Sequence, residues 1–133
     1  MPEFADPSED TRISARPDEL VLFNPVVDVS KWRARFGNNA LLASPLSRPF
    51  PGLPPTLILH GRADTVVPYA DVERFCTIAK SHGESCEVMG YDGASHGFFN
   101  SRKQPFNWQE TTLQETVHFF TQLGYLQPSG AGR

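Results

Sequence analysis

Three short apolar runs, each closed by a turn signal, constrain the fold of this chain more than any other feature. They are Leu20–Phe23, Thr56–His60 and Cys86–Tyr91. The first two are almost continuously apolar, which is typical of strands buried on both faces of a parallel sheet. Pro25 stops the first run because proline cannot donate to a strand ladder, and Gly61 ends the second. We therefore expect three strands.

Two segments with helical periodicity complete the pattern. One spans Pro68 to His82 and the other Gln109 to Leu123, and a glycine follows each. Their apolar positions recur at helical spacing, on one face of each helix: Val72, Phe75, Cys76 and Ala79 in the first, Leu113, Val117, Phe120 and Leu123 in the second. The order strand, crossover, strand, helix, strand, helix predicts an α/β fold with about three parallel strands and flanking helices.

The rest of the chain divides around this unit. Residues 1–18 are expected to be irregular, residues 19–126 to form the folded domain, and residues 127–133 to be a mobile tail. The long connection from Ser30 to Pro55 is rich in proline. We interpret it as a surface crossover with one short helix near residues 39–43.

Charge and hydropathy exclude some function classes. The formal net charge is -3 and no basic patch is visible, so we expect no nucleic-acid partner. No apolar run reaches about 18 residues, so we expect no membrane span. The first residues lack the pattern of a signal peptide. Expressed as it stands, the chain would stay in the cytoplasm, but if it is a fragment the compartment of its parent is unknown.

The two cysteines, Cys76 and Cys86, are ten positions apart. They allow a single intrachain pairing, which requires Cα atoms within roughly 7 Å. We favour two buried free thiols, with a disulfide as the alternative.

Two loops carry the residues with chemical potential. His60–Pro68, with the sequence HGRADTVVP, follows the second strand, and Tyr91–Phe98, with the sequence YDGASHGF, follows the third. Ligands bind at the carboxyl ends of strands in open α/β sheets. There Asp64 and His96 can meet: a carboxylate bonded to one imidazole nitrogen leaves the other nitrogen free to take a proton from a nucleophile.

These two loops resemble a known family. HGRADTVVP and GASHGFF are similar to the triad-acid and triad-histidine segments of α/β-hydrolases of the esterase/lipase type, in particular dienelactone-hydrolase, acetyl-xylan-esterase-like and prolyl-peptidase-like enzymes. The stretches LVLFNPVVD and SPLSRPFPGLPPTLILHG share the resemblance, which covers Glu19 to Leu126. It implies a partial α/β-hydrolase fold, Asp64 as triad acid, His96 as general base, and no metal or cofactor. The alternative is a surface Asp and a loop His that cap turns.

The resemblance also implies a missing part. In these folds the nucleophilic serine precedes the acid and the histidine along the chain, on a sharp strand-to-helix turn. Only nineteen residues precede Leu20, and none forms that pattern. We therefore interpret the chain as the C-terminal part of a serine carboxylic-ester hydrolase that lacks the nucleophile half. Its substrate in the intact parent would be a small ester, and the chain alone would be inactive.

One local motif is misleading. Residues 93–97, GASHG, satisfy the G-x-S-x-G pattern of a nucleophile turn. No helix is expected directly after it, and no acid and base follow it outside helix-like sequence. We therefore interpret Ser95 as a loop residue beside the base.

Several assignments stay open. His60 is expected to be packed or hydrogen-bonded, and Asp28 either lines the site or caps a turn. Instead of an enzyme part, the chain could be a non-catalytic half-domain acting as an assembly or binding module. Its first strand would then present an apolar edge, so we expect a homodimer or a complex with a complementing N-terminal half. A third possibility is an unrelated small α/β protein whose loops match by chance.

Overall fold

The structure is a computed structural model of the chain. It describes residues 8, 10, 12–14, 16–47, 51–102 and 105–127. Most of the N-terminal segment 1–18 expected to be irregular therefore lies outside the described residues. All of the expected C-terminal tail except residue 127 does so too.

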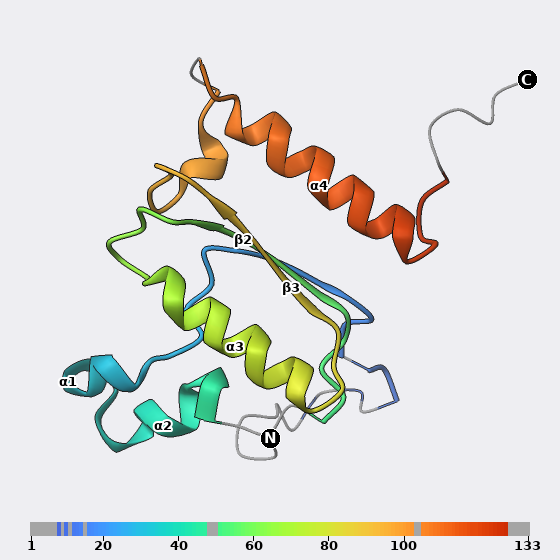
Figure 1. The fold of residues 1–133 in the computed structure, drawn as a ribbon. Helices are drawn as coiled ribbons and strands as arrows, with labels where there is room; N and C mark the ends of the chain where they lie inside the picture. The colour runs from blue at the N-terminus through green and yellow to red at the C-terminus, as the bar shows by residue number, and fades with distance from the viewer. Residues whose placement is uncertain are drawn as a thin grey trace, which may run out of the picture.

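The described part of the chain contains one sheet of three parallel strands. β1 is Leu20–Phe23, β2 is Thr56–Gly61 and β3 is Cys86–Tyr91, in the order β1-β2-β3 (Figure 1). Thr56 is in register with both Leu20 and Cys86. The predicted fold class and the three predicted strands are confirmed. The carboxyl ends of all three strands meet at one edge of the sheet.

The strands differ in burial. Every residue of β2 is buried, as expected for a central strand covered on both faces. β1 is only half-buried, with Phe23 36% exposed, so the prediction that it is buried on both faces is wrong. The physical reason is its position: in the described residues no strand pairs with its outer edge.

Two long helices cover opposite faces of the sheet (Figure 1). α3, Tyr69–Ser81, packs on one face over a cluster that includes Ile58, Val72 and Phe75. α4, Trp108–Gln122, packs on the other over Leu57, Leu59 and Phe119. Both helices begin and end within one residue of their predicted limits. In the described part of the chain, no helix is long and apolar enough to cross a membrane.

The apolar stripe of α4 singled out in the sequence packs on the sheet only through Phe120, which is partly buried against the core. Leu113 is 55% exposed and Val117 41% exposed, whereas Thr112 and Phe119 are buried. Helical spacing identifies an apolar stripe but not its partner. The side of the helix that bears Phe119 packs on the sheet, which leaves Leu113, Val117 and Leu123 at the surface.

The connection from β1 to β2 is more structured than expected. Two four-residue α-helices, α1 (Arg33–Phe36) and α2 (Ala40–Ala43), alternate with the 3-10 turns η2 (Ser30–Trp32), η3 (Gly37–Asn39) and η4 (Pro45–Ser47). Lys31 ties this connection to α3, because its Nζ donates to both carboxylate oxygens of Asp71, at 3.0 and 2.8 Å. The crossover is thereby attached to the α3 side of the sheet.

Cys76 and Cys86 form a disulfide, with their Cα atoms 5.2 Å apart. The favoured prediction of two free thiols is therefore wrong. Both thiols do belong to the buried core between α3 and the sheet. Cys76 lies on the face of α3 that packs against the sheet and Cys86 begins β3, so packing the helix on its own sheet brings the two sulfurs together.

We expect reduction of this disulfide to lower stability. Cross-linking a loop of about ten residues stabilises a fold by about 2–3 kcal/mol in the chain-entropy description. Urea unfolding with and without reductant measures the effect, and the double variant Cys76→Ala/Cys86→Ala should not respond to reductant. An unchanged urea midpoint for the reduced wild-type chain would contradict the expectation.

Candidate active site

The loops after β2 and β3 approach each other closely. Arg62 N donates to Tyr91 O at 2.9 Å, and Ala63 N donates to Ala94 O at 3.0 Å. Gly61 permits this approach, because a Cβ at this position would collide with the carbonyl group of Ala94. Because Gly61 has no side chain, the two predicted site loops have room to come into contact.

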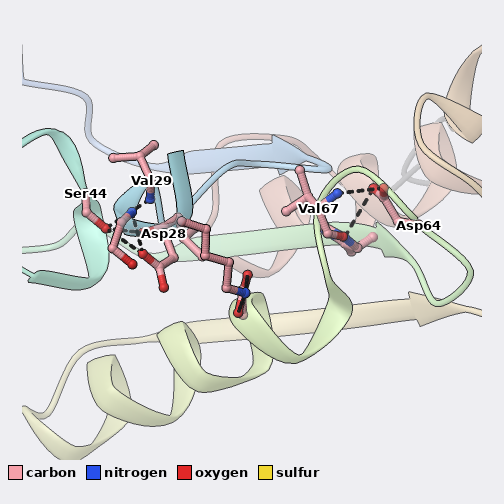
Figure 2. A network of polar contacts seen from close by, with 10 residues as sticks. Asp28, Val29, Ser44, Asp64 and Val67 are labelled. Carbon is pink, nitrogen blue, oxygen red and sulfur yellow. Dashed lines mark hydrogen bonds and ion pairs between the residues drawn. The ribbon is translucent and has the colours of Figure 1, made fainter. Parts of the chain in front are cut away.

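The carboxylate of Asp64 occupies the centre of this junction. Its Oδ1 accepts hydrogen bonds from Val66 N at 2.8 Å and Val67 N at 2.9 Å, the latter visible in Figure 2. Its Oδ2 accepts from Asn24 Nδ2 at 2.7 Å and from His96 Nδ1 at 2.8 Å. The side chain itself has no exposed surface. Four donors from three separate segments thus hold one buried charge.

The ionisation of Asp64 reflects these contacts. Burial raises its pKa, but the hydrogen bonds from Val67, His96, Val66 and Asn24 together outweigh burial and hold the pKa below its ordinary value of 3.8. Asp64 is therefore a carboxylate at neutral pH. A carboxylate only accepts hydrogen bonds, so the His96 proton that it binds must be on Nδ1.

His96 lies between the buried carboxylate and solvent. Its Nδ1 faces Asp64, while 43% of its side chain is exposed. In the described residues Nε2 has no hydrogen-bond partner. The neutral ring therefore presents an unoccupied basic nitrogen at the surface, in the orientation that a general base requires. The contact expected between these two side chains is present.

The other candidate residues of the sequence are packed in the core, cap a turn or lie in an exposed loop. His60 is fully buried and its Nε2 lies 3.0 Å from Val67 O. Asp28 caps a turn: its Oδ1 accepts from Ser30 N at 2.9 Å and from Ser44 Oγ at 3.3 Å. Figure 2 shows Asp28 and Ser44 apart from Asp64. Ser95 is exposed, and only a three-residue 3-10 turn follows its loop.

Asn24 is the contact that the sequence analysis missed. Only the next residue, Pro25, was used there, as the signal that stops the first strand. A usable signal was present, because a polar side chain at the carboxyl end of β1 shares its edge of the sheet with the loop after β2. What the sequence does not contain is the 2.7 Å hydrogen bond to Asp64.

The described residues contain no group of three His, Cys, Asp or Glu side chains arranged to hold a metal ion. Asp64 and His96 are hydrogen-bonded to each other. His60 Nε2, although 3.4 Å from Asp64 Oδ2, is nearer to the backbone oxygen of Val67. The chemistry that this arrangement supports is proton transfer at Nε2 of His96.

Comparison with known proteins identifies the family of this chain. The model of the dienelactone hydrolase family matches residues 33–124, more than half of the chain. The chain belongs to the dienelactone hydrolase family. No curated protein matches this family member.

Several solved structures of one esterase are similar to this member of the dienelactone hydrolase family. Esterase 2 of Thermogutta terrifontis phosphoramylated by tabun is 36% identical, with a TM-score of 0.82 over 93% of this chain and 48% of the esterase. The propionate-bound form of the same esterase is 34% identical, with a TM-score of 0.83 over 97% of this chain and 51% of that one. The chain therefore spans about half the length of these esterases, and its fold is that of the α/β-hydrolases.

We expect replacement of Asp64 by asparagine to destabilise the chain in a pH-dependent way. Because the native pKa of Asp64 is lowered, its stabilising effect is complete above the ordinary value of 3.8 and is lost as pH falls through the native value. Asp64→Asn should therefore cost about 2–4 kcal/mol near pH 7 and less near pH 3. Urea unfolding at several pH values measures this difference.

The matched control is Asp92→Asn, in the neighbouring loop. The side chain of Asp92 is 94% exposed and pairs with Arg62 at the surface, so its replacement should change stability little at any pH. Equal unfolding free energies for Asp64→Asn and Asp92→Asn across the pH range would contradict the assignment of a buried, ionised Asp64.

Proposed function

We propose that this chain supplies the acid and the general base of a serine carboxylic-ester hydrolase, Asp64 and His96, and that it is inactive without a nucleophilic serine from outside the chain. The observation that carries the proposal is the 2.8 Å hydrogen bond from His96 Nδ1 to the buried Asp64, with Nε2 left unoccupied. Membership of the dienelactone hydrolase family and similarity to an esterase support it.

The mechanism follows from the orientation of the ring. In the whole protein the serine oxygen attacks the ester carbonyl carbon while His96 Nε2 takes the hydroxyl proton. The imidazolium is stabilised by the ionised Asp64, which keeps its charge throughout. His96 then gives the proton to the departing alcohol oxygen. A water molecule, deprotonated by the same nitrogen, then attacks the acyl carbon; the bond from that carbon to the serine oxygen breaks, and His96 returns the proton to the serine oxygen. The oxyanion donors also come from outside this chain.

The proposed substrates are esters of short carboxylic acids. The similar esterase has been observed with propionate and with butyrate bound, and with phosphorus groups from tabun and paraoxon. Propionate and butyrate are the acids that hydrolysis of short-chain esters releases. By similarity to this esterase, an ester with a small acyl group is the substrate class we assign to the whole protein.

A chimeric enzyme tests this proposal. We expect an esterase in which this chain replaces the matching half of Thermogutta terrifontis esterase 2 to hydrolyse p-nitrophenyl butyrate. His96→Ala should reduce kcat by about a thousandfold or more, because the serine then lacks its base, and Asp64→Asn should reduce it by a comparable factor.

The controls use the same chimera and the isolated chain. Exposed Asp92→Asn should retain activity, and circular dichroism shows which chimeras fold. The chain alone should hydrolyse p-nitrophenyl acetate no faster than free imidazole at equal concentration. Turnover by the chain alone that is well above that of free imidazole, and that is lost in His96→Ala, would show that it contains its own nucleophile. A folded chimera that keeps its activity after His96→Ala would exclude His96 as the base.

A second proposal concerns assembly. In the described residues no strand pairs with the outer edge of β1, and Phe23 at the end of β1 lines the same cavity as Leu113 of α4. The name edge face is used here for the exposed apolar residues of β1, of α4 and of the turn after α4: Phe23, Leu113, Val117, Tyr125 and Leu126. A cavity of about 450 Å³ beside it is lined by Phe23, Phe99, Leu113 and Thr116. All five residues of the edge face are more than a third exposed. An unpaired strand edge beside apolar side chains favours association.

We propose that the edge face packs against a complementing half-domain, which adds a strand beside β1. The half length relative to the similar esterases supports this partner. In its absence we expect the isolated chain to pair with a second copy. Light scattering after size exclusion should report a mass above that of the monomer, and Leu113→Glu/Val117→Glu should restore the monomer.

The matched control for association is Leu41→Glu, on α2, where the leucine is 48% exposed but remote from the edge face. This variant should associate as the wild-type chain does. A wild-type chain that remains a monomer at high concentration would contradict self-association through this surface.

A further inference from the structure

Asn24 joins the end of β1 to the proposed catalytic pair. Its Nδ2 donates to Asp64 Oδ2 at 2.7 Å, and that same oxygen accepts from His96 Nδ1 at 2.8 Å. Asn24 is 5% exposed and the Asp64 side chain is fully buried. Asn24 therefore contacts the carboxylate oxygen that orients the histidine. That oxygen belongs to Asp64, which is forty residues away from Asn24 along the chain.

The backbone at Asn24 is specialised for this contact. Asn24 N donates to Leu59 O at 3.0 Å, which extends the pairing of β1 with β2 by one residue. Its φ is 45°, and it is the one non-glycine residue with positive φ in the described part of the chain. Asparagine tolerates this left-handed conformation better than most residues, but glycine tolerates it better still. The turn alone would thus be served by glycine.

The amide of Asn24 is retained at a cost. A carboxylate only accepts hydrogen bonds, so the amide nitrogen must face Asp64 and the amide oxygen must face away. That oxygen is buried and has no hydrogen-bond partner in the described residues. An unpaired buried oxygen is unfavourable, so the hydrogen bond to Asp64 is the contact that accounts for an asparagine here.

We propose that Asn24 is a positioning residue for the Asp64–His96 pair: its side-chain amide holds Oδ2 of Asp64 in the orientation that accepts the Nδ1 proton of His96. The catalytic meaning of this role rests on the proposed ester hydrolase function. The structural part, control of the His96 ring by Asn24 through Asp64, can be tested in the isolated chain.

A neutral donor suits this role better than a charged one. Val66 N and Val67 N already hold Oδ1, so the carboxylate is anchored at one oxygen. The second oxygen has to be oriented without losing its negative charge, because that charge stabilises the imidazolium. A lysine or arginine in place of Asn24 would neutralise the charge. The asparagine amide directs the oxygen and leaves the charge available to His96.

Nitrogen-15 NMR of the His96 ring provides the test, because the two neutral tautomers have different ring nitrogen shifts. In the wild-type chain near pH 8 we expect the proton on Nδ1. In Asn24→Gly, which accepts the left-handed backbone but lacks the amide, a measurable fraction should move to the Nε2–H form. Asn24→Asp keeps the side-chain shape but opposes Asp64 with a second carboxylate, and it should disturb the same signals.

Two further variants separate the possible results. Asn38→Asp adds the same charge at an exposed position and should leave the His96 spectrum unchanged. Asp64→Asn should alter it strongly. If Asp64→Asn has no effect, the Asp64–His96 pair and the proposed function fail together. If Asp64→Asn alters the spectrum but Asn24→Gly and Asn24→Asp do not, only the role of Asn24 is overturned. Asn24→Asp also serves if Asn24→Gly does not fold.

The chimeric esterase adds a kinetic readout. There Asn24→Gly should lower kcat on p-nitrophenyl butyrate on the order of ten- to a hundredfold with little change in KM, because orientation of the base and not ester binding is disturbed. A KM effect with unchanged kcat would overturn the positioning role, as would wild-type kinetics.

Discussion

The buried negative charge of Asp64 is the constraint on which the rest of the site depends. A carboxylate without exposed surface is unfavourable unless donors replace the water it has lost. Here the donors come from its own loop, from the end of β1 and from the loop after β3. Each of these segments must therefore be in place before the charge is tolerated. The site therefore forms only when the three segments around it are folded correctly.

The parallel sheet makes that convergence possible. Because all three strands run in the same direction, their carboxyl ends share one edge, and Asn24, Asp64 and His96 each follow a strand at that edge. Gly61 then lets the second and third loops touch. The loop after the central strand β2 carries the Asp64 carboxylate, while the segments after its two neighbours carry the amide and the imidazole that bond to it. Because Nδ1 of His96 is bonded to Asp64, its other ring nitrogen, Nε2, faces solvent.

The same architecture explains the unfinished surface of the molecule. β2 is buried between two strands and two helices, but β1 has a strand on one side only within the described residues. The apolar stripe of α4 lies exposed beside a cavity that Phe23 lines. The chain belongs to the dienelactone hydrolase family, and the esterases of similar structure are about twice as long. The Asp64–His96 pair and the exposed apolar residues of β1 and α4 belong to a chain that spans about half the length of these esterases.

The sequence by itself determined the elements and the two central site residues. Apolar runs and helical spacing are local properties, so the three strands, the two long helices and the loops bearing Asp64 and His96 could be predicted. Tertiary structure alone decided which side of α4 packs inward, that Cys76 pairs with Cys86, and that Asn24 contacts Asp64. These contacts join residues whose proximity depends on how helices and strands pack. A local sequence pattern does not specify which distant residues come close in space.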